Sequence, residues 1–124
     1  MASNQKRLYR DYIGKPLRMM VRTNKKNLVE KTVVIEDVTD FLVVGLEMPR
    51  DIAKADTAII LKEEIIYHVQ NESIGSLKEK ITQKKRFIDK VQSQETINRI
   101  LKRLDAAENK RKSTITKGAD GQSF

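Results

Sequence analysis

The chain lacks cysteine and tryptophan, and it contains few aromatic residues and only two prolines. Without cysteine it can form neither a disulfide framework nor a cysteine-ligated zinc site, and it offers no thiolate nucleophile. The low aromatic content, 5%, argues against a large enzyme-like pocket lined by aromatic rings. No apolar run approaches the roughly 20 residues of a membrane span, and residues 1–15 lack the apolar core of a secretory signal. These absences predict a cytoplasmic protein that does not interact with a membrane.

Basic residues outnumber acidic ones, 25 to 17, and their distribution along the chain is uneven. Residues 1–31 hold nine Lys or Arg against two acids, residues 32–69 hold three against eight, and residues 70–124 hold thirteen against seven. Basic segments attract polyanions, and nucleic acid is the commonest of these. The pattern therefore favours nucleic-acid binding by the two ends of the chain, with a merely solubilising surface as the alternative.

The apolar pattern up to Val69 predicts one short helix followed by about five strands. Residues 4–13 have helical spacing, and the sequence Gly14-Lys15-Pro16 ends that helix. Short connections require antiparallel pairing, because parallel strands need long crossovers. The alternation of apolar and polar residues and the continuous apolar runs place the strands at residues 17–22, 28–38 and 41–46 and, as two short strands or one bent strand, at 57–69.

Beyond Val69 the pattern becomes helical. Ser76 followed by Glu79 has the spacing of a capping box. The apolar stripe slips in phase, so two helices or one interrupted helix both fit residues 76–109, and such a stripe needs a partner from its own domain or from another chain. The polar and basic residues 111–124 are expected to be disordered. The stripe consists of Leu77, Ile81, Ile88, Val91, Ile97, Leu101 and Leu104, with Phe87 on its flank and Ser93 as a possible second cap.

The stretch VVIEDVTDFLVVGL, residues 33–46, places Glu36, Asp37 and Asp40 between two apolar runs, with Phe41 beside them. Acids that form a turn need no other function. As catalytic carboxylates they would need a nucleophile or a metal site, and the sequence supplies neither, so we expect no enzyme activity. Phe41 fits a core position and a base-stacking position equally well. The single histidine, His68, is expected to be structural or on the surface.

Residues 8–69 resemble the Sm-like family of RNA-binding proteins, which includes Sm, Lsm and Hfq proteins. The stretch LYRDYIGKPLRMMV resembles the entry from the N-terminal helix into the first strand, and VVIEDVTDFLVVGL is similar to the first signature of the family. The stretch AIILKEEIIYHV resembles the second signature, although Lys62-Glu63 replaces the usual Arg-Gly of Sm proteins. Against the Hfq pattern, Ile35, Glu36, Phe41 and Lys62 match, while Thr39, Asp40, Leu61 and Glu63 replace Asp, Gln, Tyr and His.

The resemblance implies a mainly β fold with an α extension. Residues 1–69 would form a short N-terminal helix and a strongly bent, five-stranded antiparallel Sm-like barrel. Residues 70–124 have no counterpart in the resemblance; their pattern and composition predict a helical extension at residues 70–110 and a disordered basic tail at residues 111–124. Adjacent subunits in this family pair their edge strands, which implies a homo-oligomeric ring of six or seven subunits, and Ile60 is a candidate for that edge. The ring would bind single-stranded RNA.

The resemblance also implies roles for individual residues. Asp37 or Asp40 would read a base edge, Phe41 would stack on a base, and Lys62 would contact a phosphate, with Glu63 and Glu64 adding negative charge beside them. A ring would repeat Lys25 and Lys26 of the first turn around one rim. No cofactor or metal is expected.

Two further expectations concern the C-terminal segment. Lys84, Lys85 and Arg86 form a basic patch next to Phe87. On a helix such a run is more often a solvated face with the aromatic ring in the apolar stripe, and RNA contact is the alternative. An oligomeric scaffold that recruits a protein partner through its C-terminal helices is the alternative function, and the unmatched apolar stripe of those helices favours it.

Overall fold

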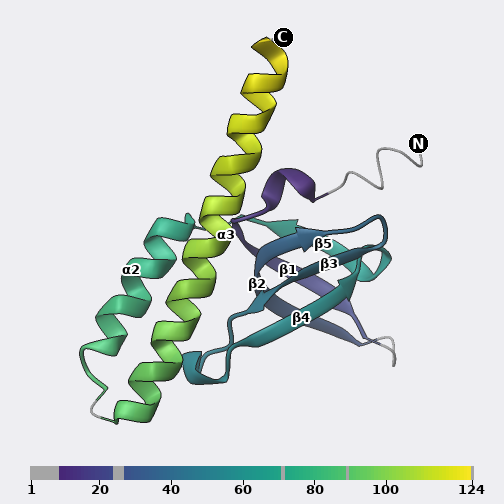
Figure 1. Cartoon of the computed structure of the whole chain (residues 1–124). Helices are drawn as coiled ribbons and strands as arrows, with labels where there is room; N and C mark the ends of the chain where they lie inside the picture. Colours follow the sequence, from purple (N-terminus) through teal and green to yellow (C-terminus); the bar gives the residue numbers. More distant parts are fainter. Residues whose placement is uncertain (1–8, 24–26, 71, 89, 124) are drawn as a thin grey trace.

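A computed structural model describes residues 9–23, 27–70, 72–88 and 90–123 of the chain, with side chains described as far as Lys110 except at Gln92. Five strands come first and two helices follow (Figure 1). The elements are the 3₁₀ turn η1 (Arg10–Tyr12), strands β1 (Pro16–Arg22), β2 (Leu28–Val38) and β3 (Leu42–Glu47), the 3₁₀ turn η2 (Ile52–Lys54), strand β4 (Asp56–Leu61), the 3₁₀ turn η3 (Lys62–Glu64), strand β5 (Ile65–Val69), and helices α2 (Ile74–Lys85) and α3 (Val91–Ser123).

The five strands form one antiparallel sheet in the order β4-β3-β2-β1-β5. Only the three residues of η3 join the two edge strands, so the sheet must curl until its edges approach each other at that end. The expected closed barrel is not formed, because among the described strands β5 pairs with β1 and β4 pairs with β3. The 3₁₀ turn η3 carries the chain from β4 to β5, but these two edge strands do not pair with each other. The fold is therefore mainly β with an α extension, as predicted, but the sheet is open.

The first hydrophobic core fills the inner face of the curled sheet. Alternation along β1 sends Leu17 and Met19 inward, where they meet Val33, Ile35 and neighbours from the other strands. The η1 segment closes one side of this core through Tyr9, whose ring lies 4.9 Å from that of His68. His68 thus has the structural role that the sequence predicted for it.

The N-terminal helix predicted for residues 4–13 is reduced to one 3₁₀ turn within the described residues. Tyr9, at its start, has a positive φ of 78°, a conformation that does not continue into an α-helix. Residues 1–8 lie outside the described part of the chain. The expected helix is therefore not supported. The packing of Tyr9 in the first core accounts for its positive φ.

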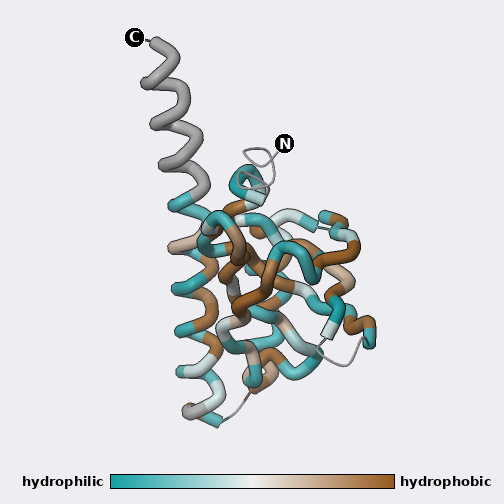
Figure 2. The backbone as a smooth tube through the Cα atoms, turned by 90° about the vertical axis from the view of Figure 1, so that its right-hand side faces the viewer, coloured by the Kyte–Doolittle hydropathy of each residue, from teal (hydrophilic) through white to brown (hydrophobic). Residues whose placement is uncertain are grey.

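A second core lies on the outer face of the sheet, where α2 and α3 pack. Val34 and Leu46 point away from the first core and are covered by residues such as Ile81, Ile97 and Leu104 of the helices. In Figure 2 the described turns of α3 alternate between apolar and polar residues, with the apolar side toward the sheet. The apolar stripe predicted from the sequence therefore finds its partner within its own chain.

Several details of the helical segment differ from the sequence-based expectation. Ser73, not Ser76, caps α2, because its Oγ accepts a hydrogen bond from the Ser76 backbone N–H at 3.1 Å. The phase break separates two helices, and Val91 begins the second one, two residues before the expected cap at Ser93. Val91 is 68% exposed and Phe87 is 85% exposed, so neither belongs to the buried stripe. The backbone of residues 111–123, expected to be disordered, continues α3.

A β-bulge in β2 explains the acidic cluster. Ile35 pairs with Gly45 and Asp37 pairs with Val44, so Glu36 is an extra residue in β2. Both acids then meet α3. Glu36 accepts hydrogen bonds from two guanidinium nitrogens of Arg103, and Asp37 lies 3.4 Å from the Lys110 amine. The bidentate hydrogen bonds raise the pKa of Arg103. The sequence placed these acids in a turn facing a pore, whereas in the structure they hold the long helix on the sheet.

Gly45 is required by the close approach of β3 to β2. A Cβ atom at this position would lie 2.3 Å from the Val34 carbonyl oxygen and 2.6 Å from Val33 Cγ1. Because one of these atoms belongs to the backbone, a larger residue can be accommodated only if the two strands separate.

We expect Gly45→Ala to lower the free energy of unfolding by about 1–3 kcal/mol, or to prevent folding, because it overpacks the sheet. Gly75→Ala is the matched control. Its Cβ would have only an ordinary contact with Ser73 Oγ, at 3.8 Å, and alanine favours the helix by about 0.5–1 kcal/mol. Urea unfolding followed by circular dichroism measures both changes. Equal stabilities of the two variants would contradict the assignment of Gly45.

Candidate nucleic-acid interface

Two turns meet at the end of the sheet where β2 leads into β3 and β4 leads into η3. The backbone N–H of Lys62 donates a hydrogen bond of 2.9 Å to the Phe41 carbonyl oxygen, which joins the two turns. Within the first turn, Thr39 Oγ1 accepts from the Leu42 N–H at 3.0 Å, and the Thr39 N–H donates to the Leu42 carbonyl at 2.9 Å. These bonds hold the tip of the turn, Asp40 and Phe41, in a defined position.

Phe41 projects from this tip and is 70% exposed. The sequence allowed either a core position or a stacking position, and the structure excludes the core. An exposed aromatic ring on a hydrogen-bonded turn is a surface on which a nucleic-acid base can stack.

Two cations accompany the ring. Arg10, from η1, approaches Asp40 with 3.9 Å between Nη2 and Oδ1. Partial burial lowers the pKa of Lys62, and the positive charge of Arg10 lowers it further, while Asp40 opposes the shift. Burial is the larger cause of the lowered pKa, and the smaller contribution of Arg10 reflects repulsion between the two cations. A phosphate placed between them would relieve that repulsion.

Three of the residues that the sequence selected, Asp40, Phe41 and Lys62, are therefore brought together. We name this group, with Arg10, the turn cluster. Sequence reasoning missed Arg10, because no periodicity relates a residue before the first strand to a turn thirty positions later. The one signal in the sequence was the position of Arg10 within LYRDYIGKPLRMMV, the stretch that resembles the entry into the first strand of Sm-like proteins.

The other selected residues lie elsewhere. Asp37 is on the outer face of β2, next to Lys110. Lys25 and Lys26 are outside the described residues. Lys84, Lys85 and Arg86 lie at the end of α2, which Figure 1 shows beside α3 and away from the edge strands. The turn cluster and this basic patch are thus separate surfaces.

The remaining chemistry of the described residues is limited. They contain no group of three or more His, Asp or Glu side chains placed to hold a metal ion. No helix in the described part of the chain has both the length and the apolar character needed to cross a membrane.

Comparisons with protein-family models, with curated proteins and with solved structures found no match to this chain. The residues of the turn cluster, their geometry and the two open edges of the sheet therefore carry the functional argument.

The exposure of Phe41 leads to a stability prediction. We expect Phe41→Ala to change the free energy of unfolding by less than about 0.5 kcal/mol, as for other exposed sites. Leu17→Ala is the contrasting control, since Leu17 is fully buried in the first core and its truncation should cost about 2–5 kcal/mol. Denaturant titration of both variants tests this. A loss at Phe41 comparable to that at Leu17 would mean that the ring is in the core.

Proposed function

We propose that this chain is an Sm-like protein that binds single-stranded RNA at the turn cluster and assembles with copies of itself through its sheet edges. The observation that supports RNA binding best is the exposed ring of Phe41 beside Arg10 and Lys62. A stacking platform next to cations matches the two repeating parts of a single strand, its bases and its phosphates.

Self-assembly is supported by the composition of the two edge strands. Native proteins protect edge strands with charged residues, proline or a covering element, because an open edge pairs with other chains. Residues 57–61 of β4 and Ile65–Val69 of β5 contain neither Lys, Arg, Asp, Glu nor Pro. Instead Ile59 and Leu61 are exposed on β4, and Ile66, Tyr67 and Val69 are exposed on β5.

These exposed side chains are arranged so that one edge complements the other. Ile59 and Leu61 lie on the outer face, because they pair with Val44 and Leu42 while Ile60 points into the first core. Tyr67 and Val69 lie on the outer face at the opposite edge, since His68 between them pairs with Met19 of the core. Pairing β4 of one copy with β5 of the next would bury the two sets against each other. This contact is heterologous, and it forms a ring when the rotation between successive copies closes. The resemblance implies a closed ring of six or seven subunits.

Two features favoured the scaffold alternative, namely the departures from the pore signature of the family and an apolar helical stripe without a partner. The second feature no longer favours it, because that stripe covers Val34 and Leu46 in the same chain. Recruitment of a protein partner through the helices would need another surface of α2 or α3.

We expect Ile59→Lys to convert the assembled protein into folded monomers, because Ile59 is 67% exposed and its replacement leaves the monomer core intact. Ile60, which the sequence indicated as an edge residue, is only 6% exposed and belongs to the first core, so Ile60→Lys would unfold the chain instead. Leu28→Lys, at an exposed apolar residue of the interior strand β2, is the matched control. Light scattering after size exclusion measures the mass. A wild type that is monomeric at high micromolar concentration would refute the assembly.

RNA binding should depend on the turn cluster in two separable ways. Phe41→Ala should weaken binding of a single-stranded oligouridine by roughly 5- to 150-fold, which corresponds to about 1–3 kcal/mol of stacking, without changing the salt dependence. Arg10→Gln and Lys62→Gln should each reduce the slope of log affinity against log salt by about 0.7. Arg99→Gln removes an exposed charge of α3 and serves as the control. Absence of RNA binding by the wild type at low salt would disprove the proposed function.

A further inference from the structure

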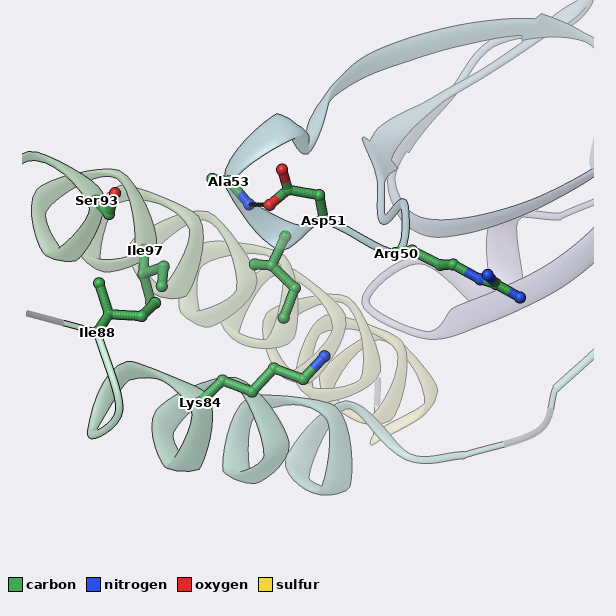
Figure 3. A pocket seen from close by; sticks show the side chains of 8 residues that line it. Arg50, Asp51, Ala53, Lys84, Ile88, Ser93 and Ile97 are labelled. Carbon is green, nitrogen blue, oxygen red and sulfur yellow. Dashed lines mark hydrogen bonds between the residues drawn. The ribbon is translucent and has the colours of Figure 1, made fainter. Parts of the chain in front are cut away.

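A cleft lies between α2 and the connection from β3 to β4, on a surface separate from the turn cluster. It consists of two adjoining hollows, of about 490 Å³ and about 230 Å³. Both are lined by Arg50, Ile52 and Lys84, so these residues form the junction between them. Figure 3 shows the smaller hollow, where Lys84 extends from α2 toward η2.

The floor of the cleft is apolar. Leu77 and Ile81 of α2, with Met48 and Ile52 of the β3–β4 connection, line the larger hollow. Leu77 and Ile81 are buried in the second core, and Met48 and Ile52 are partly buried against it. A flat apolar group bound here would lie against the partly exposed side chains of Met48 and Ile52.

The rim is basic, and its acids are already engaged. Glu72 lies 2.9 Å from the Lys80 amine, and the Asp51 carboxylate accepts a hydrogen bond from the Ala53 N–H at 3.2 Å. Within the described part of the chain, no ion pair or hydrogen bond engages the side chain of Arg50 or Lys84. Lys84 lies in the last turn of α2, where its charge interacts favourably with the negative end of the helix dipole. Arg50 has no comparable interaction with a helix end. The cleft thus attracts an anionic group.

Phe87 stands at the end of α2 and lines the larger hollow, yet it is 85% exposed. The sequence predicted that it would pack on the flank of the helical stripe, and it does not. The turn cluster also has an exposed aromatic ring beside cations, and the cleft adds an apolar floor to this combination.

We infer that this cleft binds a nucleotide of single-stranded RNA, with the base against Phe87 and the apolar floor and the phosphate at Lys84 and Arg50. The inference rests on the proposed function and adds a second contact for the same strand, distant from the turn cluster. An acidic peptide would satisfy the two cations, whereas a nucleotide also supplies a flat ring for Phe87. RNA bound at the turn cluster would therefore reach around the outer surface to the helices.

The test uses the full-length chain and a fluorescein-labelled oligouridine. Phe87→Ala should weaken binding by roughly 5- to 150-fold, the range expected from loss of one stacked base. Lys84→Gln should lower the salt slope by about 0.7. Val91→Ala, at an exposed apolar residue outside both hollows, and Lys102→Gln, at an exposed cation of α3, are matched controls that should bind like the wild type. Circular dichroism should show all four variants folded, since none of these residues is buried.

The outcomes separate the cleft from the proposed function. If Phe87→Ala and Lys84→Gln bind like the controls while Phe41→Ala is weakened, the cleft is not an RNA site and the proposed function stands. If the wild type binds no RNA, both fail. The inference holds if polyglutamate does not displace the bound oligonucleotide and if 4-thiouridine in the oligonucleotide crosslinks to residues 80–88. Displacement of the oligonucleotide from this cleft by polyglutamate at equal concentration would overturn it in favour of an acidic peptide.

Discussion

The structure depends on covering both faces of β2. Val33, Val34 and Ile35 follow one another in this strand and are all fully buried. Successive side chains in a strand point to opposite faces, so no single layer can bury all three. The curl of the sheet covers one face and the helices cover the other. The helical segment is therefore an integral part of the fold, and the sheet requires it as much as the helices require the sheet.

The uneven charge of the chain follows in part from the same arrangement. The acidic middle of the sequence meets the basic ends within one molecule, through the contacts of Glu36 with Arg103, Asp37 with Lys110, and Asp40 with Arg10. On the helices, hydrogen bonds to Asp105 and Glu108 raise the pKa of Lys78 and fasten α2 to α3. Some of the positive charge that indicates nucleic-acid binding is thus used to hold the fold. Arg50 and Lys84 of the cleft lack such contacts among the described residues, and for that reason the proposed binding at the cleft rests on these two side chains and not on the net charge.

Among the described residues, large apolar or aromatic side chains remain exposed at both edges of the sheet and at Phe41 and Phe87 after the two cores are formed. The edges of β4 and β5 have the composition of strands that pair, while Phe41 and Phe87 mark two places with cations nearby. In a chain with 5% aromatic residues, two exposed phenylalanines are a considerable part of the aromatic content. Assembly through the edges would repeat both phenylalanines around one particle, so that weak contacts with a single strand add up.

The sequence by itself determined the order of strands and helical segment after residue 16, the antiparallel pairing of successive strands from β1 to β4 and the amphipathic stripe of the helices, because these follow from local periodicity and from short connections. It also selected Asp40, Phe41 and Lys62, although only by resemblance. It did not determine the N-terminal segment, where the expected helix is not supported, or the pairing of β5 with β1. The tertiary structure alone decided that Phe41 and Phe87 are exposed, that Glu36 and Asp37 face α3, and that Ile60 is in the core. A one-residue bulge placed Asp37 on the outer face together with Glu36, and a one-residue step along a strand separates core from surface. Such shifts depend on which strand pairs with which, and no pattern within a single segment contains that information.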